Sequence, residues 1–258
     1  MSPTRSCRPM GRSPGLWSTV PSLRRRVRTL QLPMTSNAAR LETADAKQAP
    51  PGGASAAAIE LAARWIVRGR RLEMQGLADE LGFSRVTLFR NIGTREELLG
   101  EALWLLTEQM LQLAARRWEA ERREGELYSI GTGRNINMLV SRSLALHTLL
   151  GQEPALTIKV LTDPKGRVQA GVVAFVEATL RRDMDEHGYV PIADPADLAF
   201  ALVRLGESFL YADVLAARQP DADAANRIQQ ALIDGTRAPV DPTREPYGPD
   251  TEFERTHP

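Results

Sequence analysis

The stretch from Arg71 to Leu99 constrains the fold of this chain more than any other part of it. Its sequence is RLEMQGLADELGFSRVTLFRNIGTREELL. The apolar residues of its first half recur at i, i+3, i+4 and i+7, the spacing of one apolar stripe on a helix: Met74, Leu77, Ala78 and Leu81. Gly82 follows, and glycine can adopt the left-handed conformation that ends a helix. The pattern therefore predicts a short helix that ends at Gly82, with Phe83 turning into the core.

A second short helix is predicted to begin after Ser84, whose hydroxyl can accept a hydrogen bond from a backbone N–H near Thr87. Leu88 and Ile92 are spaced to face inward. The side chains left pointing outward are Arg85, Thr87 and Arg90. Arginine can bond O6 and N7 of guanine together, and threonine offers a hydroxyl and a methyl, so this face suits the major groove of DNA.

A third helix is predicted to begin at Arg95, because Gly93 interrupts the second one. Thr94 and Glu97 have the S/T-x-x-E spacing of a capping box. The helical pattern then continues to about Arg123, which is too long for a DNA-binding unit alone. We expect this helix to connect two domains.

These residues resemble the TetR family of one-component bacterial regulators, in the segments Gly82-Phe83-Ser84, Thr87-Leu88-Phe89 and Thr94-Arg95-Glu96-Glu97-Leu98. The match departs from the family where Phe89 replaces a tyrosine whose hydroxyl bonds a phosphate, where Asn91 and Ile92 replace a His/Tyr-Phe pair, and where Arg95 replaces a lysine. The resemblance implies a set of DNA contacts: Ser84, Arg85, Thr87, Phe89, Arg90, Asn91, Thr94 and Arg95. The alternative is a capped helical hairpin that does not bind DNA.

Charge is distributed unevenly over the 258 residues, although the net charge is only +1. Residues 1–41 hold eight arginines and no acid, and residues 54–95 hold seven arginines against four acids. Positive charge thus collects in the half that is expected to meet phosphates. The single cysteine, Cys7, suits a reducing cytoplasm, and no apolar run is long enough to cross a bilayer.

Four regions are predicted: a disordered basic tail (1–53), a helix-turn-helix DNA-binding domain (54–100), a helical effector-binding and dimerisation domain (101–235), and a disordered tail (236–258). The Arg24-Arg25-Arg26 cluster lacks the apolar segment of an export signal and can instead supplement DNA affinity as a basic arm. Whether Met1 or Met34 is the biological start stays open. The first helix is expected to run from a Ser55 cap to Val67.

An all-α fold is predicted, because no stretch alternates apolar and polar residues as a strand would. The expected C-terminal helices are Arg134–Leu150, Pro154–Leu161, Gly166–His187, Pro195–Ala217 and Ala222–Ile233. Glycine and proline residues separate them, and Gly131 with Gly133 is interpreted as a helix-breaking turn.

No catalytic motif, cofactor motif or metal-ligand cluster is found, because the histidines His147, His187 and His257 are widely spaced. An enzyme is therefore not expected, and neither a cofactor nor a metal. Candidate ligand contacts are the polar or large apolar side chains Trp104, Met138, His147 and Phe175. Residues 146–168 resemble the QsdR-type subgroup of the family, which implies a small-molecule effector such as an acyl lactone or a related amphiphile.

The expected function is a cytoplasmic, ligand-responsive repressor that binds a palindromic operator in double-stranded DNA, without a membrane partner. One recognition helix contacts few base pairs, so a homodimer is predicted. Its interface is expected on the two longest late helices, through Phe175, Leu202, Gly206 and Phe209. The alternative is a helical interaction protein whose hairpin does not bind DNA.

Overall fold

The computed structural model describes residues 51–235, which form eleven α-helices and no strand. The predicted all-α fold is therefore confirmed. Nearly all of the two predicted tails lies outside the described residues, including the Arg24-Arg25-Arg26 cluster and Met34. Pro51–Gly53 is the exception, since it forms the first turn of a helix.

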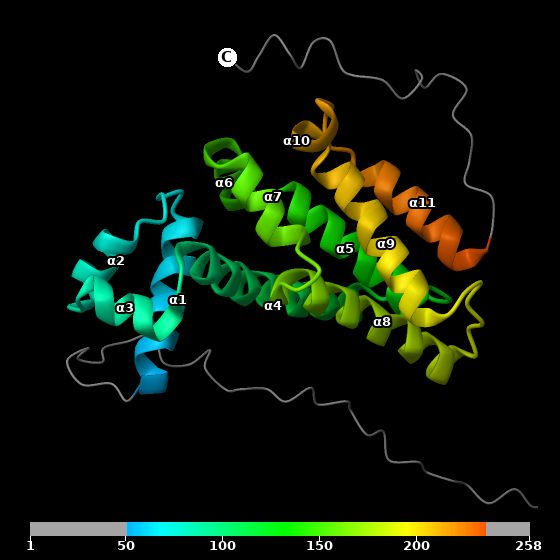
Figure 1. Cartoon of the computed structure of the whole chain (residues 1–258). Helices are drawn as coiled ribbons and strands as arrows, with labels where there is room; N and C mark the ends of the chain where they lie inside the picture. Colours follow the sequence, from blue (N-terminus) through cyan, green and yellow to red (C-terminus); the bar gives the residue numbers. More distant parts are fainter. Residues whose placement is uncertain (1–50, 236–258) are drawn as a thin grey trace, which may run out of the picture. The chain divides into compact units, whose positions relative to one another are not determined.

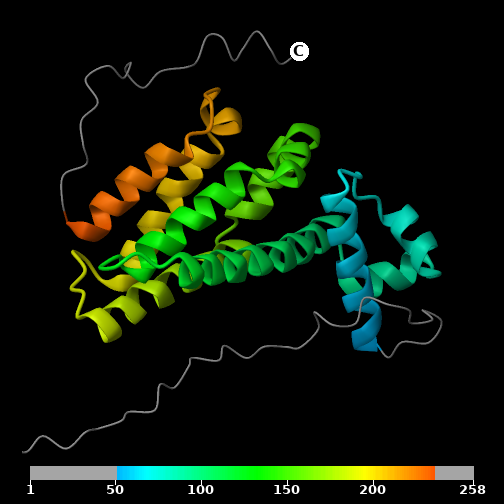
Figure 2. The same cartoon turned by 180° about the vertical axis from the view of Figure 1, so that it is seen from behind.

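The helices follow one another in Figure 1 with short connections. In chain order they are α1 (Pro51–Val67), α2 (Met74–Leu81), α3 (Arg85–Ile92), α4 (Arg95–Glu121), α5 (Tyr128–Ser141), α6 (Leu144–Gln152), α7 (Pro154–Thr162), α8 (Arg167–His187), α9 (Pro195–Leu210), α10 (Ala212–Ala216) and α11 (Ala222–Asp234). Figures 1 and 2 show α4 extending from α1–α3 to the later helices. It contacts α1, α5, α7 and α8, so it is the connecting helix that the sequence predicts.

Helices α1–α3 surround a small apolar core, to which Trp65, Leu77 and Leu88 contribute fully buried side chains. The predicted turn is confirmed, because Gly82 ends α2 in the left-handed conformation with φ of 69°. Ser84 caps α3 by accepting the Thr87 N–H at 3.0 Å. The capping box at the start of α4 is also complete. Local sequence signals thus fix the angle at which α3 leaves α2.

The predicted Ser55 cap is wrong, because α1 begins at Pro51. A proline fits the first helical position, where its missing N–H would have no partner in any case. The Ser55 hydroxyl instead donates to the Asn91 carbonyl oxygen at 3.0 Å. This hydrogen bond ties α1 to the end of α3.

Two tryptophans of α4 face glycines on neighbouring helices. A Cβ added to Gly131 of α5 would overlap the indole of Trp118, and one added to Gly171 of α8 would overlap that of Trp104. The glycines therefore allow α5 and α8 to approach α4 closely. The predicted helix-breaking turn at Gly131 and Gly133 is wrong, because both residues lie inside α5.

Two other predicted helices are divided. The helix predicted at Arg134–Leu150 is interrupted before Ser143, so that α5 and α6 are separate helices. Ser143 caps α6 by accepting the Leu146 N–H at 3.3 Å. Pro195–Ala217 breaks at Tyr211 into α9 and α10. The helices predicted at Pro154–Leu161, Gly166–His187 and Ala222–Ile233 agree with α7, α8 and α11 within one residue at each end.

The start of α5 is anchored by Asp183 of α8, whose side chain is completely buried. Its carboxylate accepts the backbone N–H of Tyr128 at 2.7 Å and that of Ser129 at 2.8 Å. A carboxylate at this position satisfies N–H groups that a helix leaves unpaired, and it complements the helix dipole. The long-range contact therefore replaces a local cap.

None of the helices within residues 51–235 combines the length and the apolar character that a membrane span needs.

Gly131→Ala is expected to destabilise the fold by about 1–3 kcal/mol, because the added methyl group overlaps the Trp118 indole and forces α5 away from α4. Urea unfolding followed by circular dichroism measures this change. Gly133→Ala, on the same helix, is the matched control, since a Cβ there meets no atom within 4 Å. It should be neutral or slightly stabilising, because alanine favours helix. Equal losses in the two variants would contradict the close approach.

Candidate nucleic-acid interface and ligand cavity

The outer face of α3 carries the predicted DNA-contacting side chains. Arg85, Thr87, Arg90 and Asn91 are all exposed. Leu88, between them, is 1% exposed and holds the helix against α1 and α2. The helix thus presents polar and cationic groups outward while one leucine fixes its orientation.

Arg85 and Arg90 form no ion pair with any residue between 51 and 235. Their guanidinium groups are therefore available to an anion from outside the protein. Arginine donors in a planar fork match phosphate oxygens and the guanine edge. Arg70, in contrast, lies over the Trp65 ring and pairs with Glu80 at 3.0 Å, so it is used within the fold.

A shallow depression lies where α2, α3 and the start of α4 meet. Four of the predicted DNA contacts line it together: Arg85, Phe89, Thr94 and Arg95. Arg71 and Gln75, which the resemblance did not include, line the same depression. The other four predicted contacts, Ser84, Thr87, Arg90 and Asn91, do not line it. Ser84 is already engaged as the α3 cap, with its hydroxyl 2.8 Å from that of Thr87.

Phe89 is 57% exposed, so it is not a core residue of α3. The sequence resemblance predicts a tyrosine here, whose hydroxyl would bond a phosphate. The exposure of Phe89 is consistent with a surface that meets a ligand, because an exposed phenylalanine has no role in the core.

Arg95 is engaged within the protein. Its guanidinium donates two hydrogen bonds to the Glu153 carboxylate, at 2.5 and 2.8 Å, and a third to the Leu72 carbonyl oxygen at 2.7 Å. Arg71 donates to the same carboxylate at 3.0 Å. We call these three side chains the Glu153 clamp. Three of the five N–H groups of the Arg95 guanidinium are therefore used inside the protein, and two remain for the predicted phosphate contact.

The Glu153 clamp connects the loop between α1 and α2, and the start of α4, to the turn between α6 and α7. Hydrogen bonds from Arg95 hold the pKa of Glu153 below its ordinary value of 4.5, against the opposing effect of burial. The neighbouring Gln152 donates to the Gly69 carbonyl oxygen at 3.1 Å, and Lys159 of α7 pairs with Glu96 of α4 at 2.8 Å. The DNA-binding helices are therefore fastened to α6 and α7 by polar contacts.

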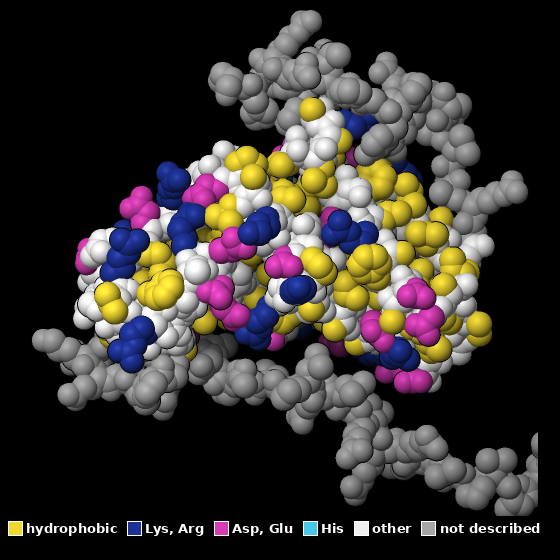
Figure 3. All heavy atoms as spheres, in the orientation of Figure 1, with side chains coloured by type: hydrophobic (Ala, Val, Ile, Leu, Met, Phe, Trp, Pro, Cys, Tyr) yellow, Lys and Arg dark blue, Asp and Glu magenta, His cyan; other side chains and the backbone are white. Residues whose placement is uncertain are grey.

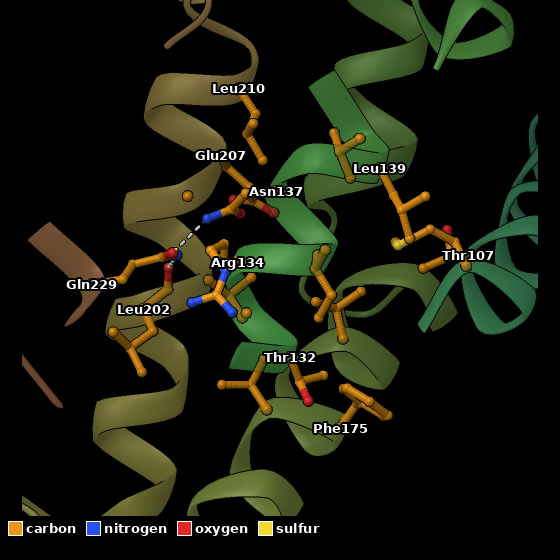
Figure 4. A pocket seen from close by; sticks show the side chains of 18 of the residues that line it. Thr107, Thr132, Arg134, Asn137, Leu139, Phe175, Leu202, Glu207, Leu210 and Gln229 are labelled. Atoms are coloured by element: carbon orange, nitrogen blue, oxygen red, sulfur yellow. Dashed lines mark hydrogen bonds between the residues drawn. The ribbon is translucent and has the colours of Figure 1, made fainter. Parts of the chain in front are cut away.

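A cavity of about 340 Å³ lies among the C-terminal helices. Figure 4 shows lining side chains from α4 (Thr107), α5 (Asn137), α8 (Phe175), α9 (Leu202) and α11 (Gln229). Ile66 of α1 also lines it. Its size and its mostly apolar lining with a few polar groups are typical of a small-molecule site.

Only one of the four predicted ligand contacts, Phe175, lines this cavity. Trp104 lies instead against Gly171, and the His147 ring nitrogen Nε2 lies 2.9 Å from the Ser141 carbonyl oxygen. Met138 is also absent from the lining. The polar lining residues Asn137, Gln169 and Gln229 were missed, although polar residues inside otherwise apolar helical stripes were a visible signal for them.

One wall of the cavity is a closed amide network. Asn137 donates to Asn226 at 2.8 Å and to Gln229 at 2.6 Å, as the dashed lines in Figure 4 indicate in part. Gln229 donates to the Leu202 carbonyl oxygen at 2.8 Å. These amides satisfy one another and join α5, α9 and α11.

Glu207 also lines the cavity. Burial raises the pKa of its carboxyl to about 7, although Arg204, at 2.7 Å, acts in the opposite direction. The wall at α9 can thus carry either a neutral or a charged carboxyl near neutral pH.

Two of the four predicted dimer residues, Leu202 and Gly206, are buried within one protomer. Leu202 is 3% exposed, and a Cβ on Gly206 would lie 2.9 Å from the Gln229 amide nitrogen of α11. Both residues face the inside of one protomer, where they line the cavity. Phe175 and Phe209 are partly buried. The apolar stripe of α9 is therefore used in the fold itself.

Within residues 51–235, no three His, Cys, Asp or Glu side chains gather in a way that could hold a metal ion.

Matches were found among protein-family models and among solved structures. Residues 124–234 match the family model described as the tetracyclin repressor-like C-terminal domain. The solved structure of the transcriptional repressor QsdR from R. erythropolis, of the TetR family, is 27% identical, covers 74% of this chain and 100% of its own, and has a TM-score of 0.66. A TetR-family regulator from Mesorhizobium loti, described as putative, is 15% identical, with 73% and 96% coverage and a TM-score of 0.41. No curated protein matches the sequence.

Glu153→Gln is expected to lower the free energy of unfolding at pH 7 by about 1–3 kcal/mol, because a neutral amide cannot satisfy both arginines. The pKa of Glu153 is lowered in the folded state, so its contribution is present above pH 4.5 and is lost as the pH falls through the lowered pKa. Urea unfolding at pH 7 and in acid should show the difference between wild type and variant shrinking in acid.

Glu96→Gln is the control for this measurement, since the Glu96–Lys159 pair also joins the two regions but is more exposed. It should change stability little at either pH. If Glu96→Gln lowers the free energy of unfolding as much as Glu153→Gln does, the Glu153 clamp stabilises the fold no more than an exposed ion pair.

Proposed function

Because this chain belongs to the TetR family of transcriptional regulators, we propose that it is a ligand-responsive repressor that binds a palindromic operator as a homodimer. TetR-family regulators are non-enzymatic DNA-binding proteins, and this chain is one of them. The cytoplasm, where bacterial DNA lies, is the proposed site of action.

DNA reading is supported above all by the face of α3. Leu88 holds the helix against the core, and the helix presents Arg85, Thr87 and Arg90 outward. Neither arginine has an ion partner among residues 51–235. Side chains at the start of a second helix are those that reach base edges in helix-turn-helix proteins. Arg85 and Thr87 are therefore proposed to read bases, and Arg90 to bind the backbone.

Ligand control is supported by the position of the cavity. Ile66 of α1 and Leu103 of α4 line it, and both belong to the core that also contains α2 and α3. A ligand there touches the DNA-binding helices from behind. If it fits best when α1 is displaced, it shifts the population away from the operator-binding state. The proposed effector class is an acyl lactone or a related amphiphile.

The dimer interface is proposed on the outward faces of α8 and α9, which lie side by side. Figure 3 shows hydrophobic side chains gathered over this part of the molecule. Phe200 is 53% exposed there. The other exposed apolar residues of these faces are small: Ala170, Ala174, Ala178 and Ala201. Small side chains around one aromatic group let helices of two protomers approach, as packing at an isologous interface requires.

Arg85→Ala is expected to reduce discrimination between the operator and random duplex by about 1–3 kcal/mol, because a bidentate base contact is lost. Fluorescence anisotropy with a fragment from the gene's own promoter region and with random duplex, at two salt concentrations, measures this. Arg116→Ala, an exposed arginine in the second half of α4, removes the same charge and should change neither affinity. If wild type binds both duplexes equally well at each salt concentration, the repressor proposal fails. The alternative, a helical interaction protein whose hairpin does not bind DNA, is then favoured.

Phe200→Glu is expected to give a folded monomer that no longer holds a palindromic operator, because it places charge at the proposed seam. Light scattering and operator binding are the measurements. Leu144→Glu replaces another exposed apolar residue, on α6, and should leave the dimer intact. A dimeric Phe200→Glu protein would move the interface to another face.

A further inference from the structure

Gln169 is a buried amide near the start of α8, and its side chain is 4% exposed. Among residues 51–235, neither its nitrogen nor its oxygen has a hydrogen-bond partner. Burying such a group is costly unless something satisfies it. Because Gln169 lines the cavity, a bound molecule is the natural source of the missing hydrogen bonds.

The surroundings of Gln169 exclude a charged partner. The cavity-lining residues that pack in one cluster with the neighbouring Val168 carry no charge: Ile66, Leu103, Leu146, Leu161, Val172 and Tyr211. The charged lining residues Arg134 and Glu207 already have ion partners, in Glu126 and Arg204. An ionised group placed against Gln169 would lose its hydration without gaining a counter-charge, which is strongly unfavourable. The group that Gln169 binds is therefore uncharged.

The cavity continues along α8 from Gln169 to Thr179, which also lines it. Ten residues of helix span about 15 Å, so the cavity is long enough for an extended chain. Phe175 and Val176 lie between the two ends, about one helical turn before Thr179. At about 30 Å³ for each water-sized group, 340 Å³ accommodates roughly eleven such groups.

We infer that the cavity takes an uncharged acyl amide of about this size, with its amide on Gln169 and its chain along α8. An amide group offers one acceptor and at least one donor, which complements the free nitrogen and the free oxygen of the glutamine together. This inference rests on the proposed function of the cavity as an effector site. It narrows the effector class to molecules whose polar head is neutral and can both donate and accept.

Three probes with equal numbers of non-hydrogen atoms test the inference: decanamide, decanoate and γ-decalactone. Isothermal titration calorimetry with the full-length protein should rank decanamide first. The lactone, which only accepts, should bind more weakly. Decanoate, which is charged, should bind at least about tenfold more weakly than decanamide, equivalent to about 1.4 kcal/mol.

Gln169→Leu should abolish this preference and, in the absence of any probe, raise the melting temperature, because an unsatisfied amide is replaced by an apolar group of similar size. Gln230→Leu is the matched control. Gln230 also lines the cavity, but it donates to Asp234 at 3.3 Å, so the preference for decanamide should persist. If the leucine variant misfolds, Gln169→Met repeats the measurement with a more adaptable side chain.

Decanoate binding as tightly as decanamide, or a preference for decanamide that survives Gln169→Leu, overturns the inference. Operator binding is measured in parallel. Loss of operator recognition with an intact probe ranking would contradict the repressor proposal alone, whereas normal operator recognition with no binding of any probe would contradict the inference alone.

Discussion

The close fit of two tryptophans against two glycines is the constraint on which the C-terminal helices depend. Trp118 and Trp104 lie almost four turns apart on α4, and each occupies space that a side chain on α5 or α8 would otherwise need. Trp118 also contacts the Tyr128 ring edge-on, with the ring centroids 4.8 Å apart. The indoles therefore set how far α5 and α8 stand from α4, and so determine the width of the cavity between them.

Helices α6 and α7 contribute both to the wall of the cavity and to the Glu153 clamp. Leu146 of α6 and Leu161 of α7 line the cavity, while Glu153 lies at the turn that joins these helices. A molecule that moves α6 or α7 relative to α4 from inside the cavity changes the distance between Glu153 and Arg95. The physical basis of coupling is thus a chain of direct contacts between ligand site and DNA-binding helices.

Features that depend on neighbouring residues were predictable from sequence, and features that depend on distant ones were not. The left-handed Gly82, the Ser84 cap and the capping box at Thr94 involve residues at most five positions apart, and the structure confirms all three. The prediction for Gly131 is wrong, because the sequence does not distinguish a glycine that makes room for a tryptophan of another helix from a glycine that ends a helix. Gly206 shows the same limit. The sequence predicts that it faces a partner protomer, whereas in the structure it faces Gln229 of its own chain.

Arg95 illustrates the same limit for function. Family resemblance places a cation at this position but says nothing about a glutamate 58 residues later in the chain that binds it. Of the four ligand contacts that the sequence predicts, only Phe175 lines the cavity, and the sequence pattern does not single out the buried amides that line it. Whether a buried polar group lines a cavity is decided by the packing of several helices, which no single stretch of sequence contains.

Asp183 gives α5 an unusual dependence on the rest of the chain. The first N–H groups of this helix are satisfied by a carboxylate 54 and 55 residues later, so the local sequence cannot hold the first turn alone. During folding, that turn becomes secure only once α8 has formed and docked. In the native protein, amide hydrogens near Tyr128 should then exchange together with the opening of α8, as one cooperative unit. The wall of the cavity is therefore only as rigid as a contact between two helices distant in sequence.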